Sequence, residues 1–404
     1  MNTSISDRLN RIQPSPTSAI TDRARQLRAI GQDVISLSQG EPDFETPEHI
    51  KAAAEQAIRD GHTRYTVVDG IPELKQAVCR KFKSENNLDY QPSEITVSSG
   101  CKQLLFNALM ATLNRGDEVI IPAPYWVSYS AMVEIADGRP IIIPCAAEQQ
   151  FKLTPDKLES AVTSATRCLI LNSPSNPTGA VYTRTELLAL AEVLLQHPEV
   201  LVITDDIYEH LIYGDVEFTT LAQVEPRLKE RTLTCNGMSK AYCMTGWRIG
   251  FAGGPESLIR AMAKLQSQSS FHPASICQHA AVAGLNGGRD FLVPQLLAYH
   301  ERRDTLVLEL NRIDGITCPV PDGAFYVFPS CIGLFGRLAP NGQTLASDTD
   351  VVNYFLDTAG VALVPGQAFG FPGHFRVSYA TDIDTLLSAC ERIQLACEKL
   401  IETN

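Results

Sequence analysis

The chain has 404 residues, 44% of them hydrophobic and 20% charged, and its formal net charge is −12. This length and composition predict a globular protein of two or three domains that can bury a large core. The negative charge disfavours a nucleic-acid partner, because phosphate neutralisation requires a basic surface, and the lack of any apolar run of about 18 residues predicts no membrane span.

Short apolar, β-branched runs alternate with helical patterns through most of the chain. Buried strands are predicted at six of these runs, namely residues 94–98, 118–122, 140–144, 167–171, 200–204 and 232–235. Helices are predicted at residues 102–113, 185–197 and 255–267, and a capping box from Thr183 to Glu186 opens the second of them. The alternation predicts an α/β fold with a mostly parallel sheet covered on both faces.

The C-terminal part of the chain follows a different order of elements. Helices are expected at residues 299–312, 348–359 and 382–401, and strands at 323–328, 361–365 and 375–379. This order predicts a second, smaller domain of the α+β class.

The cysteines and the N-terminal residues indicate where the protein works. Eleven cysteines are scattered without a C-x-x-C pair, and several lie in apolar runs. We therefore expect free thiols in a reducing cytoplasm, without disulfides or a metal site. Residues 1–18 are polar and lack the apolar core of a signal peptide.

A lysine lies in a loop of small residues, SKAYCMTGWRIG at 239–250. A lysine held in such a loop can lose solvation, which lowers the pKa of Lys240 and makes its amine nucleophilic. Arg248 follows eight residues later between Gly246 and Gly250, where it could clamp a phosphate. An ordinary surface loop is the alternative interpretation.

Further polar residues follow the predicted strands, where ligands of α/β sheets bind. The predicted strand at 200–204 is followed by two carboxylates and a phenol, which belong to Asp205, Asp206 and Tyr208. The sequence SPSNPTG at 173–179 follows another strand, and by itself it predicts only a turn. The sequence SSGCK at 98–102 opens a helix, whose N-terminal N–H groups suit a phosphate.

The pattern Ser-Lys-x5-Gly-x-Arg-x-Gly at 239–250 resembles that of class I pyridoxal-phosphate-dependent aminotransferases. The resemblance extends over nearly the whole chain, from GEPDF at 40–44 to FRVSY at 375–379. It implies the aspartate aminotransferase type of fold, with a large cofactor-binding domain and a smaller α+β domain. The expected divisions are an N-terminal arm at 1–13, a large domain at 46–292, and a small domain formed by 14–45 and 293–404.

The resemblance also implies a role for each candidate residue. Lys240 would form the Schiff base with pyridoxal phosphate and carry the substrate's proton. Asp205 would hold the proton on the pyridine nitrogen, whereas Asp206 competes for that role on sequence alone and could instead cap the next helix. The other implied cofactor contacts are Gly100, Cys101 and Lys102 at the phosphate cup, Ser239 and Arg248 on the phosphate, Trp126 stacked on the ring, Asn176 and Tyr208 at the ring hydroxyl, and Tyr65 at the phosphate of a partner subunit.

The same resemblance implies a substrate site. Arg376 would grip the α-carboxylate bidentately, with Gly40, Trp126 and Asn176 beside it. Without the resemblance, Arg376 would be interpreted as an ordinary strand-edge arginine.

Two features depart from many relatives. Gly237 stands three residues before the lysine, where many relatives have a phosphate-binding serine. The stretch from Gln266 to Cys277 contains no arginine, although some aspartate aminotransferases bind the distal carboxylate with a partner-subunit arginine there. The sequence GCKQ at 100–103 instead resembles a bacterial subgroup in which Lys102, with Ser15 and Thr17, recognises acidic substrates.

These features predict a cytoplasmic homodimer that transfers the amino group of aspartate to 2-oxoglutarate, giving oxaloacetate and glutamate. An aminotransferase for prephenate or aromatic amino acids is a close alternative, because prephenate also carries two carboxylates that Lys102 cannot exclude. A pyridoxal-phosphate enzyme that catalyses elimination would share the lysine chemistry. A non-catalytic cofactor-binding protein is disfavoured, since Lys240, Asp205 and Arg376 are all present.

Overall fold

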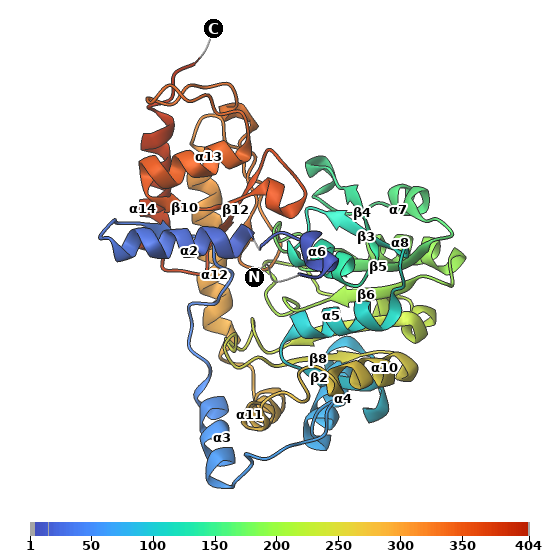
Figure 1. Cartoon of the computed structure of the whole chain (residues 1–404). Helices are drawn as coiled ribbons and strands as arrows, with labels where there is room; N and C mark the ends of the chain where they lie inside the picture. Colours follow the sequence, from blue (N-terminus) through green and yellow to red (C-terminus); the bar gives the residue numbers. More distant parts are fainter. Residues whose placement is uncertain (1–4, 15, 403–404) are drawn as a thin grey trace.

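A computed structural model describes residues 5–14 and 16–402 of the chain. Its centre is a seven-stranded sheet in the order β2-β8-β7-β6-β5-β3-β4 (Figure 1). Neighbouring strands are parallel except β8, which runs antiparallel to both β2 and β7. The strands are β2 (Ile95–Ser98), β3 (Glu118–Ala123), β4 (Arg139–Pro144), β5 (Thr166–Asn172), β6 (Leu201–Asp205), β7 (Thr232–Gly237) and β8 (Gly250–Gly253). The prediction of a mostly parallel sheet is confirmed, and each of the six predicted strands is present.

Helices cover both faces of this sheet. They are α3 (Glu48–Arg59), α4 (Pro72–Asn86), α5 (Cys101–Thr112), α6 (Ser128–Ile135), α7 (Pro155–Ala161), α8 (Arg184–Gln196), α9 (Leu221–Val224), α10 (Glu256–Ser267) and α11 (Ser275–Asn286). In β3, Val119 and Ile121 pack into the apolar cluster with α5, α6 and α10, whereas Ile120 packs into the cluster with α7, α8 and α9. Successive strand side chains point to opposite faces, so one apolar run supplies both cores.

The capping box predicted for α8 is confirmed. The hydroxyl of Thr183 accepts a hydrogen bond from the backbone N–H of Glu186 at 3.2 Å, and the Glu186 carboxylate accepts one from the backbone N–H of Thr183 at 2.8 Å. Both backbone donors at this helix start are thereby satisfied.

Residues from the two ends of the chain form a second layered unit. Figure 1 shows the blue helix α2 lying against the orange and red C-terminal elements, apart from the large sheet. Strand β1 pairs in parallel with β10, and β11, β12 and β9 form an antiparallel sheet. The elements are α2 (Pro16–Ala29), β1 (Ile35–Ser36), α12 (Leu292–Asn311), β9 (Tyr326–Val327), α13 (Asp348–Tyr354), a π-helical turn (Phe355–Ala359), β10 (Val361–Ala362), β11 (Val364–Pro365), β12 (Phe375–Ser378) and α14 (Ile383–Cys397).

Three C-terminal predictions need correction. The strand expected at 361–365 is two strands, because β10 pairs with β1 while β11 pairs with β12. The strand expected at 323–328 is confined to β9, and the helix expected at 348–359 changes to a π-helical turn after α13. The two differences in the strands come from tertiary pairing, which local sequence patterns do not encode.

The N-terminal helix α1 (Asp7–Asn10) lies on α6 of the large sheet's layer. Arg11, which ends this helix, donates a hydrogen bond to Asp137 at 2.6 Å. The chain from α1 to α2 therefore joins the two units. No helix among the described residues has both the length and the apolar character needed to cross a bilayer.

Candidate active site

A cavity of about 520 Å³ lies at the carboxyl ends of β5, β6 and β7, between the large sheet and the second unit. This position agrees with the rule that α/β sheets bind ligands at these strand ends. The predicted site residues that line it are Thr17, Gly40, Cys101, Lys102, Trp126, Asn176, Asp205, Tyr208, Ser239, Lys240, Arg248 and Arg376. Ser15 lies outside the described residues.

Lys240 follows β7 and points into this cavity. Its ammonium donates a hydrogen bond to the backbone carbonyl of Gly40 at 2.6 Å. Burial lowers the pKa of Lys240 to about 8, and repulsion from Arg376 acts in the same direction. A larger fraction of Lys240 is therefore in the neutral, nucleophilic amine form than of an exposed lysine at the same pH. A side chain at Gly40 would overlap the hydroxyl of Tyr326, so only glycine brings this carbonyl to the lysine.

Asp205 ends β6 and is only 4% exposed. Tyr129 donates its hydroxyl proton to Asp205 Oδ2 at 2.7 Å, and the thiol of Cys101 lies 3.4 Å from Oδ1. Burial raises the pKa of Asp205, while these two donors oppose the rise. Asp206 points away from the cavity and accepts a hydrogen bond from Thr204. Alternation along the strand therefore directs only the first of the two carboxylates into the site.

A cationic corner forms where α5 begins. Gly100 caps this helix with φ of +88°, and a Cβ there would overlap the guanidinium of Arg248. Arg248 has a positive φ of 57° and donates to the carbonyl of Thr245 at 2.8 Å. The helix N-terminus, the guanidinium and Ser239 together suit a phosphate.

The geometry of β7 accounts for the departure at Gly237. This residue pairs with Gly250 across β7 and β8. A Cβ at Gly237 would lie 2.9 Å from the carbonyl oxygen of Ile249. The serine found in many relatives would require this pair of strands to shift.

Arg376 reaches the cavity from β12. It is buried, and its Nη1 donates to the side-chain oxygen of Asn176 at 2.9 Å. Its Nη2 donates to the backbone carbonyl of Ser38, and its Nε is buried without a hydrogen-bond partner among the described residues. Tyr208 and Tyr326 share a hydrogen bond of 2.8 Å beside it. The Asn176–Pro177 peptide bond is cis.

Lys102 is a second lysine on the cavity wall. It is exposed at the start of α5, and its ammonium lies 5.0 Å from the centre of a Trp126 ring. Surrounding protein groups still remove part of the water around the Lys102 ammonium, which lowers its pKa, and the charge of Arg248 adds to the effect. Thr17 of α2 lines the same cavity.

Tyr65 lies outside the cavity of its own chain. Its side chain is 88% exposed and packs edge-on against Phe271 and His272, with ring centres 5.4 and 5.7 Å away. The predicted role of Tyr65 at a cofactor phosphate is therefore not formed within the described residues of this chain.

Sequence reasoning missed several polar residues of the cavity, and three of them contact Asp205 or Tyr208. Tyr129 lies on α6 three residues after Trp126, and Tyr326 lies on β9. Asn172 ends β5 directly beside Asp205 and donates to its backbone carbonyl at 2.7 Å. Only Asn172 had a sequence signal, since a polar residue at a predicted strand end is the pattern that identified Asp205.

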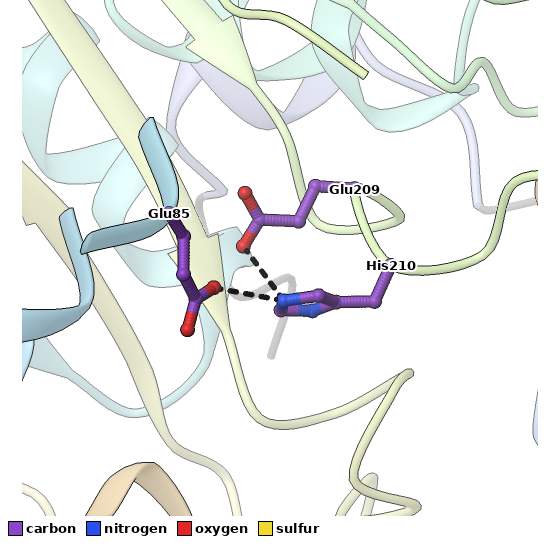
Figure 2. A group of neighbouring side chains, drawn as sticks. All are labelled: Glu85, Glu209 and His210. Atoms are coloured by element: carbon purple, nitrogen blue, oxygen red, sulfur yellow. Dashed lines mark hydrogen bonds and ion pairs between the residues drawn. The ribbon is translucent and has the colours of Figure 1, made fainter. Parts of the chain in front are cut away.

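A buried ionic cluster supports the loop that carries Tyr208. Figure 2 shows the carboxylates of Glu85 and Glu209 close to the imidazole of His210, which lies 2.9 Å from the Glu85 carboxylate. Lys81 forms an ion pair with Glu209, and Arg289 pairs with Glu85 at 3.0 Å. Ammonium and guanidinium groups of the chain already neutralise these carboxylates.

The cluster also connects the two loops that face the cavity. The amide of Asn236, on β7, donates to Glu209 at 2.7 Å, and the amide of Asn86, on α4, donates to it at 3.0 Å. The charge of Lys81, followed by that of His210 and the amide of Asn86, lowers the pKa of Glu209 to about 2 despite its burial. The charged carboxylate therefore holds the strand that leads to Lys240 against the loop after β6.

Comparison with known proteins decides the family. The sequence profile described as "Aminotransferase class I and II" matches residues 32–393. The chain belongs to this family. This aminotransferase is 56% identical to the aspartate/prephenate aminotransferase of Cereibacter sphaeroides over 396 aligned residues. The alignment covers 98% of this chain and 99% of that protein. It is 53% identical over 393 residues to an aspartate aminotransferase of Rhizobium meliloti, with 97% and 96% of the two chains covered.

Solved structures confirm the fold of the aminotransferase. The crystal structure of the aspartate aminotransferase from Rhizobium meliloti superposes with a TM-score of 0.97 at 52% identity, covering 99% of this chain and 100% of that chain. The aspartate aminotransferase from Thermus thermophilus with maleate gives a TM-score of 0.91 at 41% identity, covering 98% and 100%.

Membership of the family implies pyridoxal phosphate as the cofactor of the aminotransferase, and the cavity fits that molecule. Lys240 offers an amine for its aldehyde, and Asp205 offers an anion for its ring nitrogen. The corner at Gly100 and Arg248 suits its phosphate. The unpartnered Nε of Arg376 adds a buried donor for a substrate carboxylate.

Proposed function

We propose that this aminotransferase transfers the amino group of aspartate to 2-oxoglutarate, giving oxaloacetate and glutamate. The observation that carries the proposal is one cavity holding Lys240, Asp205 and Arg376 together with a further cation, Lys102. The names of the relatives from Cereibacter sphaeroides and Rhizobium meliloti, and the maleate in the Thermus thermophilus structure, support a dicarboxylate substrate.

The proposed cofactor contacts follow from the cavity and its neighbours. Pyridoxal phosphate, when bound, supplies an electron-withdrawing ring that stabilises negative charge on the substrate's α-carbon. The residues proposed to hold it are Gly100, Cys101, Lys102, Ser239 and Arg248 at the phosphate, Trp126 on the ring face, Asn176 and Tyr208 at the ring hydroxyl, Asp205 at the ring nitrogen, and Lys240 at the aldehyde carbon.

The chain's own residues then divide the work of the reaction. Arg376 binds the α-carboxylate of the substrate, and Asn176 and Gly40 stand beside it. Lys240, with its lowered pKa, accepts the α-proton as a neutral amine and returns it on the other side of the transferred nitrogen. Asp205 holds a proton on the ring nitrogen. Together these residues orient the bond that breaks and move one proton over a short path.

A turnover panel with purified holoenzyme tests the proposal. Aspartate, alanine and phenylalanine are each offered with 2-oxoglutarate, and formation of the keto acid is followed. Aspartate should give the highest kcat/KM. Turnover of phenylalanine without turnover of aspartate would overturn the assignment.

Prephenate as an amino acceptor is a second candidate, and one comparison favours it. The relative from Cereibacter sphaeroides, at 56% identity, is named an aspartate/prephenate aminotransferase. Prephenate carries two carboxylates, so Arg376 and Lys102 could bind one each. The assay is aspartate with prephenate in place of 2-oxoglutarate, and the absence of oxaloacetate would exclude this activity.

We predict that Lys102→Ala lowers kcat/KM for aspartate by ~10- to 1,000-fold, the equivalent of ~1.4–4 kcal/mol for a charge-assisted contact. Lys102 would read the distal carboxylate with Ser15 and Thr17, since the stretch from Gln266 to Cys277 offers no arginine. Turnover of alanine and phenylalanine should change much less. The matched control is Lys264→Ala, which removes an exposed lysine of α10 outside the cavity. An equal loss with every donor, or a loss of cofactor affinity, would assign Lys102 to the cofactor instead.

We also propose a cytoplasmic homodimer in which Tyr65 reaches the cofactor phosphate of the partner subunit. The exposure of Tyr65, with Phe271 and His272 against it, supports a surface that another chain covers. The same proposal divides the chain into an arm at 1–13, a large domain at 46–292, and a small domain at 14–45 and 293–404.

Mixed dimers test the crossing of Tyr65. We expect Tyr65→Phe to weaken cofactor binding by ~10- to 100-fold, because one hydrogen bond to a charged group is lost. Pairing a Tyr65→Phe chain with a Lys240→Ala chain should restore one intact site, since the second chain donates its tyrosine to the first. Activity no higher than that of the Tyr65→Phe homodimer would show that the tyrosine does not cross.

A further inference from the structure

The carboxylate of Asp205 is held by side chains from two helices. Tyr129, on α6, donates to Oδ2 at 2.7 Å, and Cys101, the first residue of α5, lies with its thiol 3.4 Å from Oδ1. Tyr129 is fully buried and Asp205 nearly so. Each carboxylate oxygen therefore has at least one donor from the protein before any cofactor is considered.

We propose that Tyr129 and Cys101 are positioning residues that keep the shared proton on the cofactor's ring nitrogen rather than on Asp205. The inference rests on the proposed function, in which that nitrogen faces this carboxylate. A buried acid and a pyridine compete for one proton, and the stronger base takes it. Burial alone strengthens the carboxylate as a base, whereas each hydrogen bond it accepts weakens it.

The surroundings of Asp205 support this role. Burial raises its pKa, and this rise is opposed most by the hydroxyl of Tyr129, then by the thiol of Cys101, the backbone N–H of Ile207 and the charge of Lys240. The pKa values of the Tyr129 hydroxyl and the Cys101 thiol are themselves raised well above the ordinary range. Both groups consequently keep their protons and remain donors.

The other titratable groups around this carboxylate come from β7 and the loop after β6. The thiol of Cys235, on β7, and the phenol of Tyr208 both stay protonated, because burial raises their pKa values. Asp206 points away from the cavity, and burial raises its pKa as well. Lys240 is thus the cationic side chain that acts on Asp205, and it is committed to the cofactor in the working enzyme.

Tyr129 also packs against Trp126, with ring centres 5.4 Å apart at 88°. Phenylalanine at this position would keep that edge-to-face contact and remove only the hydroxyl. Tyr129→Phe therefore separates the hydrogen bond from the packing. Cys101→Ala removes the weaker donor, and Cys101→Ser replaces the thiol by a stronger one.

Nitrogen-15 NMR of the holoenzyme, loaded with pyridoxal phosphate labelled at the ring nitrogen, measures where the proton lies. In Tyr129→Phe the resonance should move towards that of neutral pyridine, in Cys101→Ala it should move less, and in the double variant it should move most. Cys101→Ser, which supplies a stronger donor, should leave the resonance at the wild-type position or move it further towards that of protonated pyridine. We expect kcat of Tyr129→Phe to fall about 10-fold, in line with one lost hydrogen bond to a charged group.

The matched control is Tyr182→Phe, which removes a buried hydroxyl that accepts a hydrogen bond from the backbone of Leu153. This variant should leave the nitrogen resonance unchanged. An unchanged resonance in Tyr129→Phe and in Cys101→Ala, with cofactor bound, would overturn the inference and leave the proposed function intact. Wild-type protein that binds no cofactor at Lys240 would instead overturn the proposed function. If Tyr129→Phe does not fold, the Cys101 pair decides the matter.

Discussion

Lys240→Ala is expected to lower transamination by roughly 10⁴-fold or more, because the covalent contact to the cofactor and the general base disappear together. The amine of Lys240 lies beside the carbonyl of Gly40 in the cavity, with a pKa lowered to about 8. The variant should still bind pyridoxal phosphate through its phosphate and ring contacts. Steady-state turnover and the absorbance of the dialysed protein measure the two effects separately.

Lys102 is a second lysine on the same cavity wall, so the experiment must show which of the two lysines binds the cofactor covalently. Borohydride reduction of the holoenzyme followed by peptide mapping should label Lys240 alone, in the wild type and in Lys102→Ala. A small added amine should recover part of the lost proton transfer in Lys240→Ala. A label on Lys102, or full activity of Lys240→Ala, would contradict the assignment.

The fold was predictable where each strand was an apolar, β-branched run. The runs that became β3, β5 and β6 are of this kind, and they are found within a few residues of the expected bounds. Strand β8 was missed, because its sequence is GFAG and half of it is glycine. Its place between β2 and β7 comes from antiparallel pairing on both sides, which no local pattern expresses.

The site was predictable where a motif specifies a residue type and its spacing. The resemblance at 239–250 identified Lys240 and Arg248, and both line the cavity. Tyr129 could not be found in this way, because its hydroxyl meets Asp205 across 76 positions of sequence. Nothing in the residues around Tyr129 states which carboxylate it will face. Such pairs arise only when the sheet brings α6 over the end of β6.

Adjacent carboxylates posed the hardest choice in the sequence, and they give the second large prediction. Asp205→Asn should lower kcat by roughly 10²- to 10³-fold, the range for loss of one buried electrostatic contact to the reacting centre. The amide cannot hold a proton on the ring nitrogen, although it occupies nearly the same volume as the carboxyl group. Cofactor binding should persist, since the phosphate corner at Gly100 and Arg248 is untouched. Single-turnover kinetics with aspartate measures the proton-transfer step apart from binding.

Asp206→Asn is the matched control, and its expected mildness has a physical reason. Burial raises the pKa of Asp206 well above its ordinary value, and neither the hydroxyl of Thr220 nor the charge of Lys81 reverses this rise, whereas Lys81 does reverse it for Glu209. Asparagine therefore replaces a carboxyl group that already resists ionisation, and it can still accept the hydrogen bond of Thr204. Asp205 differs because its two donors favour the charged form in the cavity. If Asp206→Asn lowers kcat strongly and Asp205→Asn lowers it only slightly, the carboxylate at the ring nitrogen is that of Asp206 and the assignment to Asp205 is wrong.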